Sequence, residues 1–412
     1  MYSAYYNAIR RELLIMKYAI VIMDGAADEP IEQFDGLTAL EKADIPNTDW
    51  IAINGRQGLV ATVPEGFPPG SDVAMMSLFG YDPAVYYTGR SPLEAIAAGI
   101  RTDPDDLIFR CNLVAIADGV MIDHSAGHID SNQASELMRM LNDELGNDEI
   151  TFYPGTSYRG LMVWKGLKYE DFIIPPHDIL EQEVGKNMPR GRAGRKLCQL
   201  MEKAAGLLAE HDVNKVRCDL GENPASHIWL WGQGYKPRME SFRSRYGIGA
   251  SVITAVDLVG GLARSVSIRK ISVDGATGYI DTDYQAKGKA AIEAFADNDL
   301  VIVHVEAPDE ASHGAMAEEK VRSIENIDKL IVGPILEFLK SSGDDWRIMV
   351  SPDHPTYVRL RTHVAEPVPF VMAGTNISPV RQLAYSEKNA KECGWLIARG
   401  HELMEYFLKA AI

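Results

Sequence analysis

The sequence predicts an α/β protein in which a mostly parallel sheet is flanked by helices and carries a small inserted α+β domain. Continuous apolar runs at residues 18–23, 300–305 and 348–350 are typical of buried central strands. Amphipathic stretches such as 318–339 alternate with these runs and predict the flanking helices. We expect that helix to bend at Pro334, because proline cannot donate the backbone hydrogen bond of a helix interior.

A change of pattern near residue 110 predicts the inserted domain. Two short strands are joined at Asp118–Gly119, which is a hairpin signal; an amphipathic helix follows, and two further strands flank Pro154–Gly155. This ββαββ order differs from the alternation of strands and helices on either side. We therefore expect a discontinuous main domain and one inserted domain, which span residues 17–109 with 186–412, and residues 110–185.

The composition narrows the class of protein. The chain has 412 residues, 46% of them hydrophobic and 24% charged, which is ordinary for a soluble protein of two or three domains. Its net charge of −17 provides no basic footprint, so we expect no nucleic-acid partner. An anionic small substrate stays compatible with this charge, because a metal ion or a few arginines can reverse the local field.

The spacing of the cysteines and the length of the apolar segments predict a protein of the cytoplasm. The four cysteines form no CxxC pair, which fits a reducing cytoplasm and disfavours a zinc ribbon. No uninterrupted run of about 18 apolar residues is present, so we expect no membrane span. The first recognisable element begins at Lys17, so Met1 and Met16 both remain candidate starts, and the oligomeric state stays open.

Polar side chains with the chemistry of metal ligands follow several of the apolar strands. The carboxyl ends of parallel strands gather at one edge of a sheet, which is where such folds bind ligands. Taken singly, each position has a simpler explanation, since aspartate is a common turn residue and serine a common helix cap. Taken together, the positions supply three carboxylates, three imidazoles and one hydroxyl, namely Asp24, Ser71, Asp309, His313, Asp353, His354 and His363.

This set of side chains is sufficient for two divalent cations. Mixed aspartate and histidine ligands accept manganese, magnesium, zinc or cobalt, and a pair of metals suits phosphoryl chemistry because it clamps the attacking and leaving oxygens. Ser71 is the expected nucleophile, since Gly70 allows close approach of the backbone and the helix start offers N–H groups to a phosphoryl group. The sequence contains neither a GxSxG elbow nor a phosphate-binding loop of the GxxxxGKS or GxxxxGKT type.

A family resemblance extends these observations from Lys17 to the C-terminus. The chain resembles the archaeal-type cofactor-independent, that is 2,3-bisphosphoglycerate-independent, phosphoglycerate mutases of the alkaline phosphatase superfamily. The similarity lies in an ordered series of segments: MDGAAD, GSDVAMMSLFGYDP, TGRSPLEAIAAGI, MIDHSAGHI, SYRGLMVW, PPHDI, WLWGQG, HVEAPDEASH, SPDHPT and RTH. The resemblance implies an alkaline-phosphatase-like sheet and the interconversion of 3-phosphoglycerate and 2-phosphoglycerate through a phosphoserine at Ser71.

The same resemblance implies the ligands of two metal ions, usually manganese or magnesium. One ion would be held by Asp24, Ser71, Asp353 and His354, and the other by Asp309, His313 and His363. The inserted domain at 110–185 would act as a lid that excludes water, because an exposed phosphoserine would hydrolyse. The candidate ligands of the small phosphorylated hydroxy-acid substrate are Arg90, His128 and Arg159.

Several alternatives remain open at this stage. His124 and Gly160 stand where members of the family often carry a tyrosine and a bulkier polar residue, which leaves the substrate open. The second hypothesis is a related phosphotransferase, such as a homoserine-kinase-like enzyme, and the third is a hydrolase of phosphate or sulfate monoesters. A non-catalytic binding protein is disfavoured, because the nucleophile and all the metal-type side chains are present.

Overall fold

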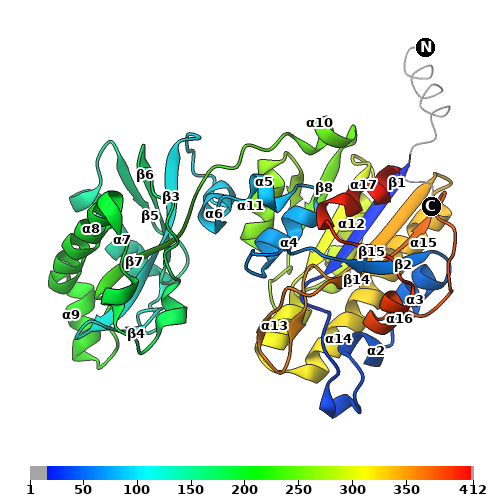
Figure 1. The fold of residues 1–412 in the computed structure, drawn as a ribbon, viewed down its shortest axis with the longest axis horizontal. Coiled ribbons are helices and arrows are strands. Elements are labelled where there is room, and N and C mark those ends of the chain that lie inside the picture. The colour runs from blue at the N-terminus through cyan, green and yellow to red at the C-terminus, as the bar shows by residue number, and fades with distance from the viewer. Residues whose placement is uncertain (1–15, 410–412) are drawn as a thin grey trace. The chain divides into compact units, whose positions relative to one another are not determined.

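The computed structural model describes residues 16–409, which form two compact units (Figure 1). Unit 1 combines Met1–Tyr87 with Met239–Ile412, and unit 2 is the continuous segment Thr88–Arg238. The expected α/β class is confirmed, because unit 1 contains a large, mostly parallel sheet flanked by helices. Whether Met1 is the start of the protein concerns residues outside the described range.

Unit 1 is built on an eight-stranded sheet with the order β15-β2-β14-β11-β1-β10-β8-β9. Neighbouring strands are parallel except where β14 runs against β11 and β2. One reversed strand therefore separates two parallel parts of the sheet. The strands are β1 (Lys17–Met23), β2 (Arg56–Val60), β8 (Ala250–Ile253), β9 (Arg269–Ile271), β10 (Leu300–Val305), β11 (Trp346–Ser351), β14 (Val368–Gly374) and β15 (Leu396–Ile397); β12 (Thr356–Tyr357) and β13 (Thr362–His363) form a separate pair.

Helices connect and cover these strands. Their bounds in unit 1 are η1 (Glu32–Phe34), α2 (Ala39–Lys42), α3 (Pro46–Ile53), α4 (Ser71–Leu78), α5 (Pro83–Tyr86), α10 (Phe242–Tyr246), α11 (Asp257–Ser265), α12 (Tyr284–Ala294), α13 (Ala307–His313), α14 (Ala317–Ile327), η4 (Asp328–Val332), α15 (Gly333–Ser341), α16 (Glu387–Glu392), η5 (Gly400–Glu402) and α17 (Leu403–Lys409). Within the described residues, no helix combines the length and apolarity that a membrane crossing requires.

Strand β1 lies in the middle of the sheet and is buried on both faces, as its unbroken apolar sequence predicts. Successive side chains of a strand point to opposite layers. Ala19 and Val21 share a core with Ile324 of α14, whereas the ring of Tyr18 meets Phe407 of α17 edge-on, with 5.7 Å between centroids. Burial on both faces fixes the strand's position and thereby the place of the residue that follows it.

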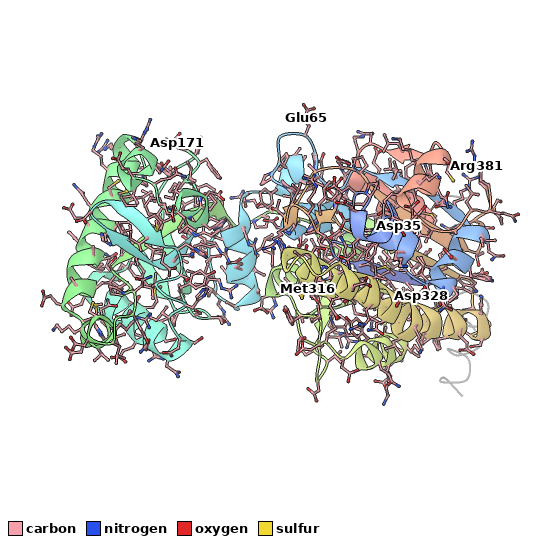
Figure 2. The ribbon with its side chains drawn as sticks, turned by 90° about the horizontal axis from the view of Figure 1, so that it is seen from below. Asp35, Glu65, Asp171, Met316, Asp328 and Arg381 are labelled. Carbon is pink, nitrogen blue, oxygen red and sulfur yellow. The ribbon has the colours of Figure 1, made fainter. Side chains whose placement is uncertain are left out.

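The helix expected over 318–339 is interrupted before its proline. A π-helical turn, η4, separates α14 from α15, and Pro334 is the second residue of α15, directly after that turn. The proline has no N–H to donate to the preceding turn. Asp328 opens the π turn; its buried carboxylate accepts hydrogen bonds from the N–H and the hydroxyl of Thr48, at 2.7 and 2.6 Å. Figure 2 labels Asp328 on this helical run. The expected bend at Pro334 stays a prediction, and the structure adds a π turn directly before it.

Unit 2 is an antiparallel sheet with α7 and α8 on one face and α6 against the other. Strands follow the order β4-β3-β6-β5, and β7 pairs with the other side of β3. Leu107, Phe109 and Cys111 of β3 face a core shared with α7 and α8. The elements are α6 (Arg90–Ala97), β3 (Asp106–Ala117), β4 (Val120–Asp123), α7 (Ser131–Leu145), β5 (Ile150–Tyr153), β6 (Arg159–Lys165), η2 (Pro176–Ile179), η3 (Val184–Asn187), α8 (Gly191–Glu210), α9 (Asp212–Asp219) and β7 (His227–Tyr235).

The boundaries of unit 2 differ from those expected for the inserted domain. The expected range, 110–185, extends in the structure to Thr88–Arg238. Strand β7 pairs with β3 from Leu107↔Tyr235 to Val114↔His227, and α8 contributes Leu197 and Leu200 to the same core. Strands β3 and β7 are more than a hundred residues apart, so the change of local pattern that marks the ββαββ run could not reveal their pairing.

Candidate functional site

Three neighbouring strands of unit 1 place polar groups at one edge of the sheet. Strands β11, β1 and β10 are adjacent and parallel, so their carboxyl ends lie side by side. Asp24 follows β1, Asp353 and His354 follow β11, and Asp309 lies in α13, directly after β10. This is the edge at which ligand sites of parallel sheets form, and it brings together residues more than three hundred positions apart.

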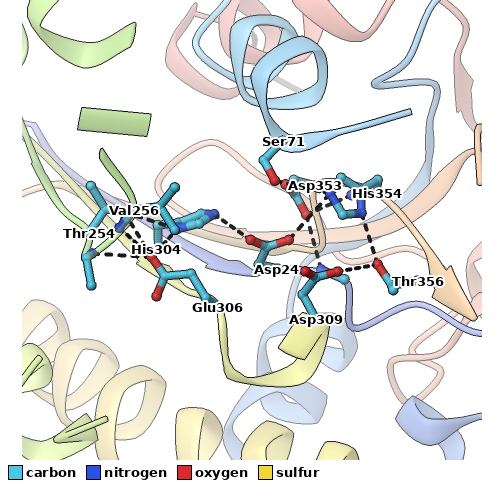
Figure 3. A network of polar contacts seen from close by, with 12 residues as sticks. Asp24, Ser71, Thr254, Val256, His304, Glu306, Asp309, Asp353, His354 and Thr356 are labelled. Atoms are coloured by element: carbon cyan, nitrogen blue, oxygen red, sulfur yellow. Dashed lines mark hydrogen bonds and ion pairs between the residues drawn. The ribbon is translucent and has the colours of Figure 1, made fainter. Parts of the chain in front are cut away.

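The first cluster consists of Asp24, Asp353 and His354, all buried (Figure 3). One ligand atom from each lies within 4.8 Å of the others. The Nε2 atom of His354 is 3.5 Å from Oδ1 of Asp24 and 3.5 Å from Oδ2 of Asp353. The Oγ atom of Ser71 lies 3.3 Å from the same Nε2. The hydroxyl therefore faces the space that the two carboxylates and the imidazole surround.

The unsatisfied atoms of this cluster have the character of cation ligands. Oδ1 of Asp24 and Oδ2 of Asp353 are buried and have no hydrogen-bond donor among the described residues. Burial raises the pKa of Asp24 well above its ordinary value, and the charges of Asp353 and Asp309 raise it further. Buried carboxylates without donors are costly unless a counter-charge is present. A divalent cation between these oxygens would remove both the desolvation and the repulsion.

The second cluster consists of Asp309, His313 and His363. Nε2 of His313 is 3.2 Å from Oδ2 of Asp309, and Nε2 of His363 is 3.4 Å from Oδ1. Hydrogen bonds from the two histidines hold the pKa of Asp309 well below its ordinary value, against the effect of burial. The hydrogen bond to Asp309 raises the pKa of His313 to about 9.

The orientation of the two histidines also fits a metal ion. Nδ1 of His313 lies 2.9 Å from the carbonyl oxygen of Arg361, and Nδ1 of His363 lies 3.3 Å from that of Pro69. A carbonyl only accepts, so each Nδ1 donates and each Nε2 is left for the cluster, the arrangement typical of metal-binding histidines. The two Nε2 atoms approach to 3.0 Å. In the deprotonated form, the two Nε2 atoms and the carboxylate of Asp309 would bind a shared cation.

Ser71 is free to act because its hydroxyl has no role in capping. Gly70 is the N-cap of α4 and Ser71 is the first helical residue, so Ser71 does not occupy the capping position. Its Oγ lies 3.3 Å from Nε2 of His354. The expectation that Ser71 itself lies at the cap is thus corrected by one position. As the first residue of a helix, it lies beside backbone N–H groups that have no intrahelical partner. The simpler explanation of Ser71 as a capping residue does not hold.

Gly25 allows the two clusters to approach. Its φ is +64°, and a Cβ atom there would lie 2.6 Å from Oδ1 of Asp309 and 2.6 Å from the hydroxyl of Thr356. Any side chain would therefore push α13 away from the end of β1. The hydroxyl of Thr356 donates to Oδ1 of Asp309 at 2.5 Å and lies 3.2 Å from Nδ1 of His354. Thr356 links the two clusters and was not expected from the sequence.

A buried histidine of β10 was also missed. Nε2 of His304 lies 3.2 Å from Oδ2 of Asp24, and its Nδ1 lies 3.0 Å from Oε1 of Glu306. Burial lowers the pKa of His304, but the charge of Glu306 and the contact with Asp24 outweigh it and raise the pKa to about 10. The available signal was a histidine within the otherwise apolar strand sequence LVIVHV.

Two of the three expected substrate ligands, Arg90 and Arg159, lie close enough to Arg110 in unit 2 to lower its pKa. Nε of Arg90 is 2.9 Å from Glu94, whose other oxygen is 2.8 Å from Nε of Arg110. Burial lowers the pKa of Arg110, Glu94 opposes this effect, and the charges of Arg90 and Arg159 add to the lowering. Arg159 stacks over Tyr158 at 5.6 Å and has no carboxylate partner among the described residues. Arg110 was missed because an arginine inside an apolar strand gave no spacing signal.

The third expected ligand, His128, does not join these arginines through any contact within the described chain. Its side chain is exposed, and its backbone adopts φ +51° ahead of α7. Other aromatic groups lie near the arginines instead. Arg110 stacks over Trp231 at 4.8 Å, and the ring of His177 lies 5.4 Å from that of Trp231. Burial lowers the pKa of His177, and Arg110 and Arg90 contribute to the lowering.

Comparison with known proteins agrees with this architecture. The sequence model of the family described as 2,3-bisphosphoglycerate-independent phosphoglycerate mutase matches residues 52–214. The chain is 45% identical to a protein of that name from Methanosarcina mazei, over 96% of this chain and 100% of that protein. It is 46% identical to the second mutase of this type from Methanothermobacter thermautotrophicus, over 97% of this chain and 99% of that protein.

Solved structures show the same similarity. The PH0037 protein of Pyrococcus horikoshii aligns with a TM-score of 0.81 and 28% identity, over 96% of this chain and 97% of that chain. The cofactor-independent phosphoglycerate mutase of Thermoplasma acidophilum aligns with a TM-score of 0.65 and 25% identity, over 96% of this chain and 100% of that chain. On its near-complete match to curated relatives, the chain belongs to the 2,3-bisphosphoglycerate-independent phosphoglycerate mutase family.

Proposed function

We propose that the protein is an isomerase that interconverts 3-phosphoglycerate and 2-phosphoglycerate through a phosphoserine at Ser71. The observation that carries the proposal is the Ser71 hydroxyl, which faces the Asp24, Asp353 and His354 cluster at the carboxyl edge of the sheet (Figure 3). Family membership supports the assignment, since the curated relatives carry the name of this reaction.

The two clusters are assigned as sites for two divalent cations. Asp24, Asp353 and His354, with the hydroxyl of Ser71 beside them, would hold one ion, and Asp309, His313 and His363 would hold the other. Manganese or magnesium is the expected metal, and the mixed oxygen and nitrogen ligands also accept zinc or cobalt. When bound, the ions neutralise the charge of the phosphoryl group and lower the pKa of the serine hydroxyl.

The chain's own residues account for the transfer. Oγ of Ser71 attacks the phosphorus of 3-phosphoglycerate; the Oγ–P bond forms, the bond from phosphorus to O3 breaks, and the proton of the serine ends on O3. Glycerate then reorients, and its O2 attacks the phosphoserine, which restores the serine and yields 2-phosphoglycerate. The backbone N–H groups of Ser71 and Asp72 at the start of α4 would bind the phosphoryl oxygens, whereas that of Val73 donates to Oδ1 of Asp72.

Recognition of the substrate carboxylate is assigned to unit 2. The guanidinium of Arg159 has no carboxylate partner among the described residues, and Arg90 and Arg110 share Glu94, so the group carries excess positive charge. A planar guanidinium matches a carboxylate in two parallel hydrogen bonds. Arg90 and Arg159 stay proposed ligands, Arg110 is added, and His128 stays a candidate without structural support. The role of unit 2 as a lid is part of the same proposal, since the phosphoserine must be kept from water.

The experiment is an enolase-coupled assay on protein reconstituted with Mn²⁺, supplied with 3-phosphoglycerate and no bisphosphoglycerate. We expect turnover, with Ser71 phosphorylated in protein quenched during the reaction. Release of inorganic phosphate as the main product would favour a hydrolase, and transfer to homoserine would favour the alternative phosphotransferase. Absence of mutase turnover in Mn²⁺-loaded, folded protein would refute the proposal. A cytoplasmic location stays a prediction, supported by four free cysteines.

A further inference from the structure

We infer that His304, held in place by Glu306, is a positioning residue that aims the carboxylate of Asp24 at the metal site. The inference rests on the proposed function, because it concerns the ion assigned to Asp24, Asp353 and His354. It adds residues that lie outside both candidate ligand clusters. The network is drawn in Figure 3.

The place of His304 in the sheet allows it to reach both neighbouring strand ends. It lies on β10, between β1 and β8, one residue before the strand ends, and pairs with Ile22 in register. Asp24 follows β1 on one side, and Thr254 follows β8 on the other. The ring is fully buried, with Nε2 3.2 Å from Oδ2 of Asp24 and Nδ1 3.3 Å from the hydroxyl of Thr254. Its orientation is therefore fixed from two directions.

Glu306 fixes the other side of the ring and is itself tightly held. Its Oε1 lies 3.0 Å from Nδ1 of His304, and accepts hydrogen bonds from the hydroxyl of Thr254 at 3.1 Å and the N–H of Val256 at 3.1 Å. Its Oε2 lies 3.2 Å from Nζ of Lys287, which is fully buried. A carboxylate with this many donors cannot rotate without breaking several hydrogen bonds. Glu306 is therefore a rigid anchor for the imidazole.

The hydrogen bonds and ion pairs around His304 determine which oxygen of Asp24 faces the metal site. Nε2 of His304 pairs by charge with Oδ2 of Asp24 at 3.2 Å and makes no hydrogen bond among the described residues. The remaining oxygen, Oδ1, has no hydrogen-bond partner in the described chain either and lies 3.5 Å from Nε2 of His354. Without His304, the carboxylate could turn and present either oxygen, or neither, to the cluster. Partners in the outer shell of a metal site typically change metal affinity or activity by about 10–100-fold when removed.

The effect should be confined to one of the two ions. The second cluster has its own supports, because Thr356 donates to Asp309 and the carbonyl of Arg361 orients His313. No hydrogen bond or ion pair within the described chain joins His304 to Asp309, His313 or His363 directly. A general loss of stability would weaken both sites, so a one-site effect distinguishes positioning from a merely structural role.

The test is a Mn²⁺ titration of metal-stripped, full-length protein, followed by calorimetry and by the electron paramagnetic resonance of free Mn²⁺. We expect the wild type to bind two ions and His304→Leu to bind one of them about 10–100-fold more weakly, with the other unchanged. His304→Gln should restore the affinity, because the glutamine amide nitrogen reaches the position of Nε2. His304→Asn should not, because its amide lies near the position of Nδ1, on the Glu306 side.

Two further variants keep the test decisive. Glu306→Gln should weaken the same ion even if His304→Leu does not fold. Asn214→Leu is the matched control, since it removes buried hydrogen bonds of unit 2, to Leu208 and Ala225, without touching either cluster. Equal Mn²⁺ affinities in wild type, His304→Leu and Glu306→Gln, or equal weakening of both ions, would overturn the inference alone. Failure of the wild type to bind two ions would overturn the metal assignment on which it rests.

Discussion

Replacement of Ser71 by alanine separates catalysis from stability more sharply than any other change in the proposed site. Its Oγ makes a single side-chain contact, at 3.3 Å from Nε2 of His354, and the residue does not occupy the capping position of α4. A hydrogen bond of this kind contributes about 0.5–1.5 kcal/mol to stability. Alanine is also well tolerated in a helix. We therefore expect Ser71→Ala to lower the free energy of unfolding by about 1 kcal/mol at most.

The expected loss of catalytic rate in Ser71→Ala is much larger than the expected loss of stability. Loss of a covalent nucleophile removes the reaction path itself, and such losses are typically about 10⁴-fold or more in kcat. A stability loss of about 1 kcal/mol corresponds to a shift in melting temperature of only about 2–4 °C in a chain of this class. Metal binding should largely persist, because Asp24, Asp353 and His354 remain. The variant should therefore be folded, metal-loaded and inactive.

Three measurements on the same preparation test this reasoning. The enolase-coupled assay gives turnover, calorimetric melting gives stability, and intact-protein mass spectrometry of quenched reactions detects the phosphoserine. Ser71→Cys is a useful companion, since it keeps a nucleophilic atom at nearly the same position. Undiminished turnover in Ser71→Ala, or a phosphorylated species in that variant, would refute the assignment of Ser71.

Three further predictions concern metal, substrate and pH. Removal of metal with a chelator should abolish turnover. It should also lower the melting temperature by about 5–10 °C, relative to protein in Mn²⁺ at about 100 times its Kd, and added Mn²⁺ should restore both properties. Activity that survives complete removal of metal would contradict the two-metal proposal. Arg159→Ala should raise KM for 3-phosphoglycerate by about 10–100-fold at constant melting temperature, because one charge-assisted hydrogen bond to the substrate is lost. The control is Arg322→Ala, which replaces an exposed arginine of α14. An equal KM in both variants would show that Arg159 does not bind the substrate. Burial raises the pKa of Glu387 to about 7. The folded protein therefore favours the protonated form of Glu387 more than the unfolded chain does. This preference adds to the free energy of unfolding below about pH 4.5 and is lost as the pH rises to about 7, a decrease of about 3 kcal/mol. Urea unfolding at about pH 5 and about pH 7.5 should show that loss in the wild type and not in Glu387→Gln, and parallel profiles would contradict it.

The parts of the site that the sequence predicted are those with a local signature. Asp24, Asp309 and Asp353 each follow a buried apolar strand or start the helix after it, and such strands are recognisable without a partner. That the three strands are neighbours is a property of the sheet order, which an apolar run does not encode. Their convergence could be expected only from the general rule for parallel sheets and from the resemblance to the family.

The site residues that the sequence did not predict contact residues that are far away in the sequence. His304 looks like a core position of β10, and its contact with Asp24 depends on which strand lies beside it. Arg110 is likewise inside a strand, and its meaning depends on Glu94 of α6 and Trp231 of β7. The extent of unit 2 was underestimated for the same reason, because β7 joins β3 across more than a hundred residues. The local sequence pattern therefore predicted individual helices, strands and strand ends. The polar networks and the unit boundaries could be identified only once the structure showed which strands are paired.

The order in which the main sheet can be completed during synthesis follows from its topology. Strand β1 is synthesised long before its partners, since Tyr18 pairs with Leu300 and Arg347. Thr88–Arg238 is continuous and can close its own sheet long before then. For most of translation, the nascent chain thus carries an apolar strand with both edges unpaired, which is the kind of segment that aggregates or recruits chaperones. We therefore expect unit 1 to complete its sheet late, after unit 2 has been synthesised.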